Sequence, residues 1–214
     1  FFQAEDGIRG VERSRGLGDV YKRQSLSPPL NLTLGEFNFS GDIAVIEGII
    51  SINATISNKV GKIISMIQYA VDWDEVKNVT NPVDGIYDED VESVHIEINA
   101  TSYSPGRHVI CLRACTKQGV KSSWFNFSFV VRELSARYNL IALSIKPLKK
   151  LRASDLARAI GSSLKGIWRW CADKQEFESY IPGVSTTEED FLLEQGYGYF
   201  IYLSKPEKLV EVGE

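Results

Sequence analysis

Alternation of apolar and polar side chains through residues 25–132 predicts a set of β-strands. The alternation is clearest where Val94, Ile96 and Ile98 fall on one face and polar residues fall on the other. Turns rich in glycine and proline separate the segments, and no helical period lies between them. Several strands at this spacing predict a β-sandwich. The predicted strands are 45–57, 62–72, 91–103, 106–116 and 122–131.

The pattern changes after residues 133–137, a short polar segment that we interpret as a linker. Beyond it, Leu156 and Ile160 stand at helical spacing, with Ser154 as the expected N-cap and Gly161 as the stop. The rest of residues 138–214 predicts a compact α+β domain with one or two short helices. Its other predicted elements are strands at 138–145, 197–203 and 208–212, a hairpin of 166–172 with 176–181, and a short helix at 186–191.

Residues 1–24 follow neither pattern. They are rich in glycine, arginine and aspartate and show no apolar period, which predicts disorder. The stretches FFQAEDGIRG and SRGLGDVYKRQ resemble translated sequencing adapters at the ends of metagenomic reading frames. We therefore expect this segment to be non-biological and the natural N-terminus to lie elsewhere, so that a missing signal peptide carries no information about export.

The first predicted domain also resembles a known group of modules. EGIISINATISNKVGKIISMIQYAVD followed by SPGRHVICLRACTKQGVKSSW is similar to the immunoglobulin-like or fibronectin type III-like modules of exported bacterial and archaeal proteins. The resemblance covers residues 35–132 and departs from the usual pattern at Cys115 and Thr116. It implies an immunoglobulin-like β-sandwich that acts as a spacer or a binding surface.

The second predicted domain resembles a small module of archaeal and bacterial surface proteins. The matching stretches are YNLIAL from Tyr138, IWRW from Ile167, FESYIPG from Phe177 and GYGYFIY from Gly196. They are similar to a pattern of the form WNLISLP…GxGYWIY, with Tyr138 in place of the first tryptophan. The resemblance covers nearly all of residues 138–214 and implies no catalytic role.

Composition restricts the classes of function. With 43% hydrophobic residues and a net charge of −4, the chain is globular in type and offers no basic face for nucleic acid. No apolar run reaches the ~18 residues of a membrane span. Cys111 and Cys115 would lie ~13 Å apart on one strand, too far for a disulfide. Unpaired thiols are the favoured interpretation, and a bridge from Cys171 across the domains stays open.

Glycosylation is the strongest chemical signal in the sequence. Six of the nine asparagines begin an Asn-x-Ser/Thr sequon, where about one would be expected from ordinary composition. All six lie in the predicted sandwich, and those in strands are usable only where the side chain faces solvent. The candidate sites are Asn31, Asn38, Asn53, Asn78, Asn99 and Asn126.

Other polar residues give weaker signals. The acidic segment that runs from Asp84 to Glu92 has carboxylates for a cation, but a solvated loop is the better interpretation and no metal or other cofactor is expected. The only histidines, His95 and His108, stand on predicted strands without a nucleophile motif. The resemblance to the immunoglobulin-like modules implies that His108 holds the position of a buried polar residue, and we expect it to be structural. Gly196 and Gly198 precede a strand, so they do not form a nucleotide loop.

Aromatic residues concentrate in the second domain. Trp168, Trp170 and Tyr180 are candidates for a flat ligand strip, because residues 168 and 170 share one face of a strand. The competing interpretation packs that face against the helix that carries Leu156 and Ile160. Since a small domain has little core to spare, we expect at least one of the two tryptophans to be buried.

Together these observations predict a function without catalysis. We expect an extracellular structural or binding module of a glycosylated surface-layer or adhesin-type protein, of archaeal character, whose partners are cell-surface polysaccharide or other surface proteins. The alternative is an accessory C-terminal region of a secreted hydrolase with its catalytic domain upstream.

Overall fold

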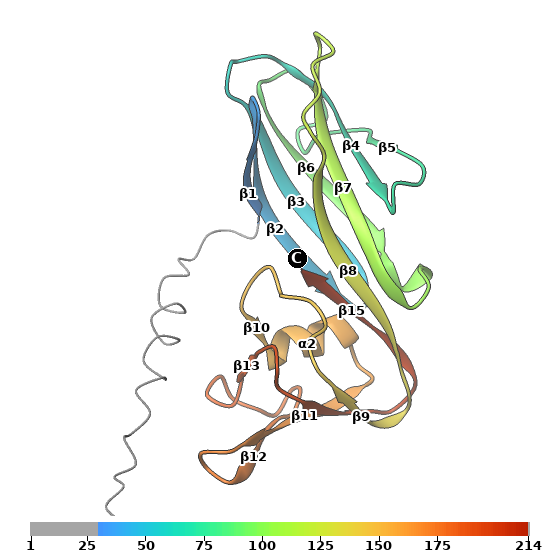
Figure 1. Ribbon diagram of the computed structural model, residues 1–214, viewed down its shortest axis with the longest axis vertical. Helices are drawn as coiled ribbons and strands as arrows, with labels where there is room; N and C mark the ends of the chain where they lie inside the picture. Colours follow the sequence, from blue (N-terminus) through green and yellow to red (C-terminus); the bar gives the residue numbers. More distant parts are fainter. Residues whose placement is uncertain (1–29, 214) are drawn as a thin grey trace, which may run out of the picture.

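A computed structural model of the chain describes residues 30–213, and these form a mainly β protein built in two parts (Figure 1). The expectations for residues 1–24 lie outside the described residues. The first part is a sandwich of two antiparallel sheets. Sheet A has the strand order β1-β2-β3-β6, with β1 Leu30–Leu34, β2 Phe37–Ile46, β3 Ile49–Asn58 and β6 Val91–Asn99. Sheet B has the order β15-β8-β7-β4-β5, with β4 Ile64–Val71, β5 Lys77–Val79, β7 Gly106–Thr116, β8 Phe125–Leu134 and β15 Glu207–Gly213.

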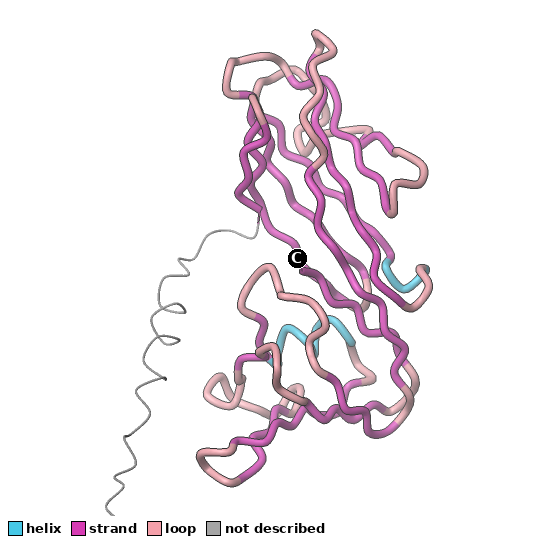
Figure 2. The backbone as a smooth tube through the Cα atoms, viewed as in Figure 1, coloured by secondary structure: helices cyan, strands magenta, loops and turns pink. Residues whose placement is uncertain are grey.

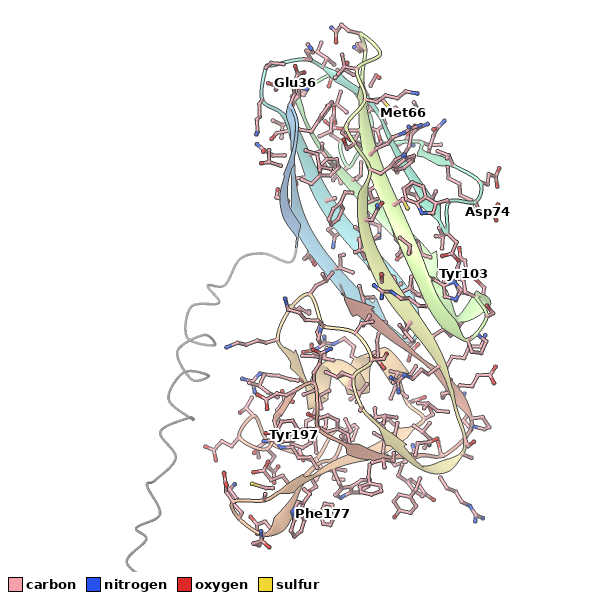
Figure 3. All side chains as sticks on the ribbon, viewed as in Figure 1. Glu36, Met66, Asp74, Tyr103, Phe177 and Tyr197 are labelled. Atoms are coloured by element: carbon pink, nitrogen blue, oxygen red, sulfur yellow. The ribbon has the colours of Figure 1, made fainter. Side chains whose placement is uncertain are left out.

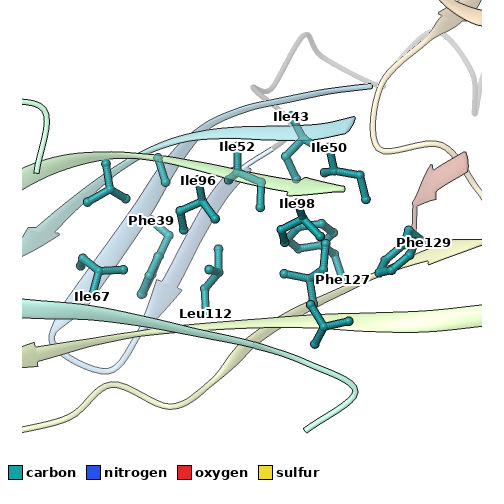
Figure 4. Close-up of a cluster of buried hydrophobic side chains, with 14 of the residues drawn as sticks. Phe39, Ile43, Ile50, Ile52, Ile67, Ile96, Ile98, Leu112, Phe127 and Phe129 are labelled. Atoms are coloured by element: carbon teal, nitrogen blue, oxygen red, sulfur yellow. The ribbon is translucent and has the colours of Figure 1, made fainter. Parts of the chain in front are cut away.

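The two sheets face each other across a core of branched aliphatic and aromatic side chains (Figure 4). Alternate residues point inward, as the period of a strand requires. Thus Val94, Ile96 and Ile98 of β6 are buried, while their neighbours point outward. His108 is also buried, with its ring stacked 4.9 Å from that of Phe129. The predicted sandwich and its inward positions are therefore confirmed in this region.

The start of the sandwich differs from the sequence prediction. Residues 45–57 are not one strand, because the chain turns back at Glu47 and Gly48 between β2 and β3. Both turn residues have positive φ, 48° and 77°, as a two-residue hairpin with the favoured twist requires. Apolar residues continue on both sides of this turn, so the hydrophobic pattern alone hides it. Strand β5 and residues 37–44 of β2 were also not predicted.

The second part contains one helix and a further four-stranded sheet. Sheet C has the order β12-β11-β14-β9, and a two-residue pair joins β10 to β13. The helix α2 spans Ala153–Ile160. The strands are β9 Arg137–Ile141, β10 Leu151–Arg152, β11 Leu164–Cys171, β12 Glu176–Tyr180, β13 Leu192–Leu193 and β14 Tyr199–Leu203.

Several local predictions for this part are confirmed and two are wrong. The hairpin of β11 with β12 and the stop of the helix at Gly161 are as expected. Ser154 is not the N-cap, because Arg152 holds that position and the Ser154 hydroxyl donates to Asp190 Oδ2 at 2.7 Å. Residues 186–191 do not form a helix. The N–H of Thr186 donates to Glu189 Oε2 at 2.7 Å, as in a helix N-cap, but no helix follows.

The last strand lies in an unexpected place. Residues 208–212 were expected to complete the second domain, but β15 pairs with β8 of the sandwich over seven residue pairs, from Glu207↔Leu134 to Gly213↔Ser128. Figure 2 shows this strand running upward along the sandwich from the lower part of the molecule. The first segment of the predicted linker is likewise β-structure, since β8 ends at Leu134 and β9 begins at Arg137.

Strand β15 supplies side chains to both hydrophobic cores. Leu209 is fully buried in the core of the second part, together with Leu156 and Ile167. The next residue, Val210, points the other way into the sandwich core. Because successive side chains of a strand face opposite sides, one short strand covers the two cores at once.

A buried carboxylate fixes the same strand to the second part. Glu211 Oε2 accepts hydrogen bonds from the N–H and the hydroxyl of Ser144, at 2.8 and 2.9 Å. Its other oxygen lies 3.2 Å from Arg132 Nε, an ion pair without good hydrogen-bond geometry. Since a buried charge is tolerated only where it is paired, this contact fixes the register of β15 against the loop after β9.

The β2–β3 hairpin also contacts the second part. The N–H groups of Glu47 and Gly48 donate to the carbonyl oxygens of Arg158 and Ala159, each at 3.1 Å. These carbonyls belong to the last turn of α2 and have no partner within the helix. The hairpin therefore caps the C-terminal end of the helix.

Substitution of Leu209 by alanine tests whether the two parts unfold together. We expect a loss of ~3 kcal/mol in the free energy of unfolding, the usual result of opening a cavity at a buried leucine. Urea denaturation in a background with Trp168 and Trp170 replaced by phenylalanine reports on the sandwich alone, through Trp73 and Trp124. The sandwich should lose stability even though Leu209 faces the other core.

The control is Glu207→Ala, on the same strand, whose carboxylate forms a partly exposed pair with Lys205. It should change stability by less than ~1 kcal/mol. An unchanged urea midpoint of the sandwich in the Leu209 variant would instead support separate folding about residues 133–137.

Candidate functional site

The outer face of sheet C carries a group of exposed apolar side chains, which we call the aromatic face. It consists of Tyr138, Leu140, Trp168, Trp170, Phe177, Phe200 and Tyr202. Register places them together, because Trp168 pairs with Phe200, and Phe200 with Leu140. Phe177 lies at the end of the molecule away from the sandwich (Figure 3). Five of the seven are between 41% and 68% exposed.

The aromatic face is exposed because the helix covers the opposite side of the sheet. Leu156 and Ile160 of α2 pack with Ile167, Tyr199 and other residues that alternate with the exposed ones. Tyr199 is fully buried, and its hydroxyl accepts the N–H of Glu194 at 2.6 Å. Sheet C therefore has one covered face and one face open to solvent.

The exposed rings contact one another. The ring centroids of Tyr138 and Tyr202 lie 4.8 Å apart, and those of Trp170 and Phe177 lie 5.1 Å apart. Phe177 also contacts Phe200, at 6.2 Å. The interplanar angles are between 66° and 70°, an edge-to-face geometry that aromatic pairs favour. These contacts hold the side chains in one arrangement before any ligand arrives.

Gly166 leaves room for the Trp168 ring. A Cβ atom at this glycine would lie 2.5 Å from Trp168 Cη2 and 2.9 Å from Ile181 Cδ1. The indole therefore lies against the backbone of its own strand, which explains why Trp168 is partly buried although it points outward.

The polar atoms of the aromatic face have no partners among residues 30–213. The hydroxyls of Tyr138 and Tyr202 and the indole N–H groups of Trp168 and Trp170 form no hydrogen bond there, and none of the seven side chains is charged. Tyrosine hydroxyls and indole N–H groups are hydrogen-bonding groups that usually find a partner. The face therefore offers both ring surfaces and donors to a ligand.

The structure separates the three residues predicted as ligand contacts. Trp168 and Trp170 share the aromatic face, whereas Tyr180 pairs with Ile167 and packs on the helix side of the sheet. The expectation that at least one tryptophan is buried under the helix is wrong, since Trp170 is 46% exposed and Trp168 is partly exposed. The other members of the aromatic face were not among the predicted ligand contacts, although the period of two in the paired strands places them on the same side. They are Tyr138, Leu140, Phe177, Phe200 and Tyr202.

The predicted glycosylation sites fall mostly on outer faces. Among the asparagines whose side chains are described, Asn38 is half-buried and the other four are exposed: Asn53, Asn78, Asn99 and Asn126. The backbone of Asn31 lies in β1, and its side chain lies outside the described part. Asn99 and Asn126, the sequon asparagines expected to lie within strands, thus both meet the condition of facing solvent.

A polar cleft of about 300 Å³ lies at the end of β4, beside the loop that precedes β7. His108 connects its walls, with Nδ1 at 2.7 Å from Asp72 Oδ2 and Nε2 at 2.8 Å from the carbonyl oxygen of Ser104. Asp72 Oδ1 also accepts the N–H of Val109 at 2.8 Å. The other side chains in the cleft are Tyr69, Val71, Asp74, Glu75, Lys77 and Tyr103.

The state of His108 follows from these two partners. Burial alone would lower the pKa of His108, but the hydrogen bond to Asp72, the bond to the Ser104 carbonyl and the charge of Asp72 outweigh it and raise the pKa above its usual value. Both neighbours are acceptors, so the doubly protonated ring satisfies both at once. The expectation of a structural histidine is consistent with this placement.

The acidic segment from Asp84 to Glu92 is organised around Glu92. This side chain is buried, and its Oε1 accepts the N–H groups of Asp88 and Glu89 at 2.9 and 3.0 Å. Burial raises the pKa of Glu92, against the effect of these two hydrogen bonds. Among residues 30–213 no group of three or more acidic, histidine or cysteine side chains is placed to hold a metal ion.

The three cysteines are unpaired. Cys111 and Cys115 are buried on β7, on the side of sheet B that faces away from the sandwich core, and burial raises the pKa of the Cys111 thiol. Cys171 lies at the end of β11 and is partly exposed. The favoured interpretation of three free thiols is confirmed, and the bridge from Cys171 is not formed.

Comparison of the chain with protein-family models, with curated proteins and with solved structures finds no match in any of the three. Within residues 30–213, the single α-helix is too short to cross a membrane.

Replacing Asp72 by asparagine tests the charge on His108. A raised pKa in the folded state means that the stabilisation is fully present below the usual histidine pKa of ~6.5 and is lost as the pH rises through the higher folded value. The variant should therefore lose about 1 kcal/mol more stability at pH 5.5 than at pH 8.5, a small figure because Asp72 is partly exposed. Thermal melting at the two pH values measures the difference.

Asp74→Asn is the matched control, since Asp74 lines the same cleft without a hydrogen bond to His108. It should show no such dependence. An equal loss at both pH values in the Asp72 variant would show that His108 stays neutral in the folded protein.

Proposed function

We propose that this chain is a non-enzymatic extracellular binding module whose aromatic face recognises a neutral polysaccharide. The observation that carries the proposal is a solvent-facing sheet surface with six aromatic rings and no charged side chain. Sugar rings present C–H faces that pack on aromatic rings and hydroxyls that bond to polar groups. The tyrosine hydroxyls and indole N–H groups, which have no partner within the described residues 30–213, supply the second kind of contact.

A polysaccharide fits this surface better than a purely apolar partner. An apolar partner would bury the polar atoms of Tyr138, Tyr202, Trp168 and Trp170 without a partner, which costs about 1–3 kcal/mol for each group. A charged polymer would find no counter-charge on the face. A neutral chain of sugars can bond to these polar atoms and needs no counter-charge.

The architecture supports a module of the exported type. The strands of the sandwich divide into β1-β2-β3-β6 and β8-β7-β4-β5, with the middle strands of the sequence crossing between sheets, as in immunoglobulin-like sandwiches. We propose that the first part is such a domain and the second a small α+β module. The solvent-facing sequon asparagines support a glycosylated surface-layer or adhesin-type protein. The same face would equally serve as the accessory region of a secreted hydrolase.

Alanine substitution of Trp170 and of Phe177 tests the recognition surface. Each should weaken binding to a responsive neutral polysaccharide by at least ~10-fold, equivalent to about 1.4 kcal/mol. Affinity electrophoresis against a panel of soluble glucans, mannans and galactans, followed by calorimetry, gives the dissociation constants. Thermal stability should stay nearly constant, because both side chains are exposed.

The matched control is Tyr197→Ala, which removes an exposed aromatic side chain outside the aromatic face and should leave polysaccharide binding unchanged. If the protein binds no neutral polysaccharide in the panel, the proposal is refuted. Binding to charged polymers alone, or retained affinity in both variants, would also refute it.

A further inference from the structure

A second group of aromatic side chains lies on the outer face of sheet B, far from the aromatic face of sheet C. Trp73 and Trp124 contact edge to face, with ring centroids 5.7 Å apart and an interplanar angle of 86°. The guanidinium of Arg113 lies 4.3 Å from the centre of the Trp124 ring, and its Nε donates to Gln68 Oε1 at 2.7 Å. We call Trp73, Trp124 and Arg113 the tryptophan platform.

The side chains of the tryptophan platform are fixed by their mutual contacts, and the Trp73 ring is exposed to solvent. Trp73 is 57% exposed, with its backbone at a positive φ of 60° that turns the chain after β4. Trp124 is partly buried between Trp73 and Arg113. Within residues 30–213, the Trp73 ring contacts no aromatic ring other than that of Trp124. The exposed side of the Trp73 ring is therefore available to a ligand.

Asn126 lies next to this platform. It begins the sequon Asn126-Phe127-Ser128, its side chain is exposed, and it stands directly opposite Cys111 on β7. Trp124 precedes it by two residues, directly before β8 begins at Phe125. Side chains two residues apart along an extended chain point to the same side, about 7 Å apart. A sugar attached to Asn126 would therefore begin within one sugar length of the Trp124 ring.

Asn126 also differs from the other sequon asparagines whose side chains are described. Their amide oxygens are engaged: Asn38 accepts from Thr33, Asn53 bonds His95, Asn78 accepts from Gln68 and Asn99 accepts from Thr101. The Asn126 amide forms no hydrogen bond with residues 30–213. Its side chain is thus free to take the orientation that an attached glycan requires.

We propose that Asn126 carries an N-linked glycan whose first sugars pack on the tryptophan platform. The inference rests on the glycosylated, exported character of the proposed function, and it concerns a different face of the molecule from the polysaccharide surface. The new bond joins Asn126 Nδ2 to the anomeric carbon of the first sugar, which a lipid-linked oligosaccharide donates as its lipid phosphate leaves, and the amide loses one proton. The apolar faces of the sugars then cover Trp73.

Attachment comes before β8 joins sheet B. In the folded protein, the hydroxyl of Ser128 is buried and accepts hydrogen bonds from Arg107 Nε and Nη2, at 3.1 and 2.9 Å. The sequon is then part of a paired strand and not an extended segment that an enzyme could bind. The glycan is therefore already attached when β8 pairs with β7, and its first sugars then pack on the tryptophan platform.

The test uses the full chain, secreted from a eukaryotic host that transfers N-glycans to Asn-x-Ser/Thr. Glycopeptide mass spectrometry should find Asn126 occupied. Asn126→Gln should lower Tm by ~2–4 °C relative to the glycosylated parent, the shift expected from about 1 kcal/mol in a protein of this size. In a Trp73→Ala background the same substitution should have no further effect. Asn53→Gln, exposed on the opposite sheet, is the matched control: it removes a sequon and the exposed hydrogen bond to His95 but no contact with the tryptophan platform, so it should lower Tm by less than Asn126→Gln does.

Three outcomes would overturn the inference. An unoccupied Asn126 beside occupied sequons would refute the site, and occupancy with equal Tm shifts in the Trp73 and Trp73→Ala backgrounds would refute the packing. Absence of glycan at every sequon would refute this inference together with the glycoprotein character of the chain. Polysaccharide binding by protein from a host without N-glycosylation tests the aromatic face independently, so the two failures are distinguishable.

Discussion

Pairing of β15 with β8 is the interaction on which the rest of the structure depends. Without it, β8 would be an exposed edge of sheet B, with a row of unpaired N–H and C=O groups. With it, Leu209 closes one core and Val210 closes the other. The chain must therefore complete its second part before its first sheet is finished. This long-range closure carries an entropic cost that local hairpins do not have.

The sequence predicts most strands because alternation is a local signal, and β7 and the β11–β12 hairpin illustrate this. It does not predict the sheet to which a strand belongs. Residues 208–212 alternate like any half-buried strand, and nothing in that stretch shows that Leu209 and Val210 serve different cores. The turn at Glu47 and Gly48 is hidden for a related reason, because apolar residues continue through it.

The candidate site was partly predictable. Period two places Trp168 and Trp170 on one face, but the choice between helix and solvent depends on which side α2 covers. Core economy in a small domain favoured burial of the tryptophans. In the structure, Tyr199, Ile201 and Leu203 fill the core on the side of sheet C that α2 covers. The two tryptophans therefore remain on the solvent side. We propose a different sugar for each of the two tryptophan-bearing surfaces: one bound from outside and one covalently attached.

The cap that the β2–β3 hairpin places on α2 limits where this protein tolerates added sequence. Hairpin tips are ordinarily good places for a tag or an inserted domain. Here the tip at Glu47 and Gly48 is bonded to the last helical carbonyls, and a Cβ at Gly161 would already lie 2.8 Å from the Glu47 carboxylate. The tip around Gly119, with open space beside it, has no such restriction. An epitope or fluorescent domain belongs there, where it leaves the junction of the two parts and the proposed polysaccharide surface untouched.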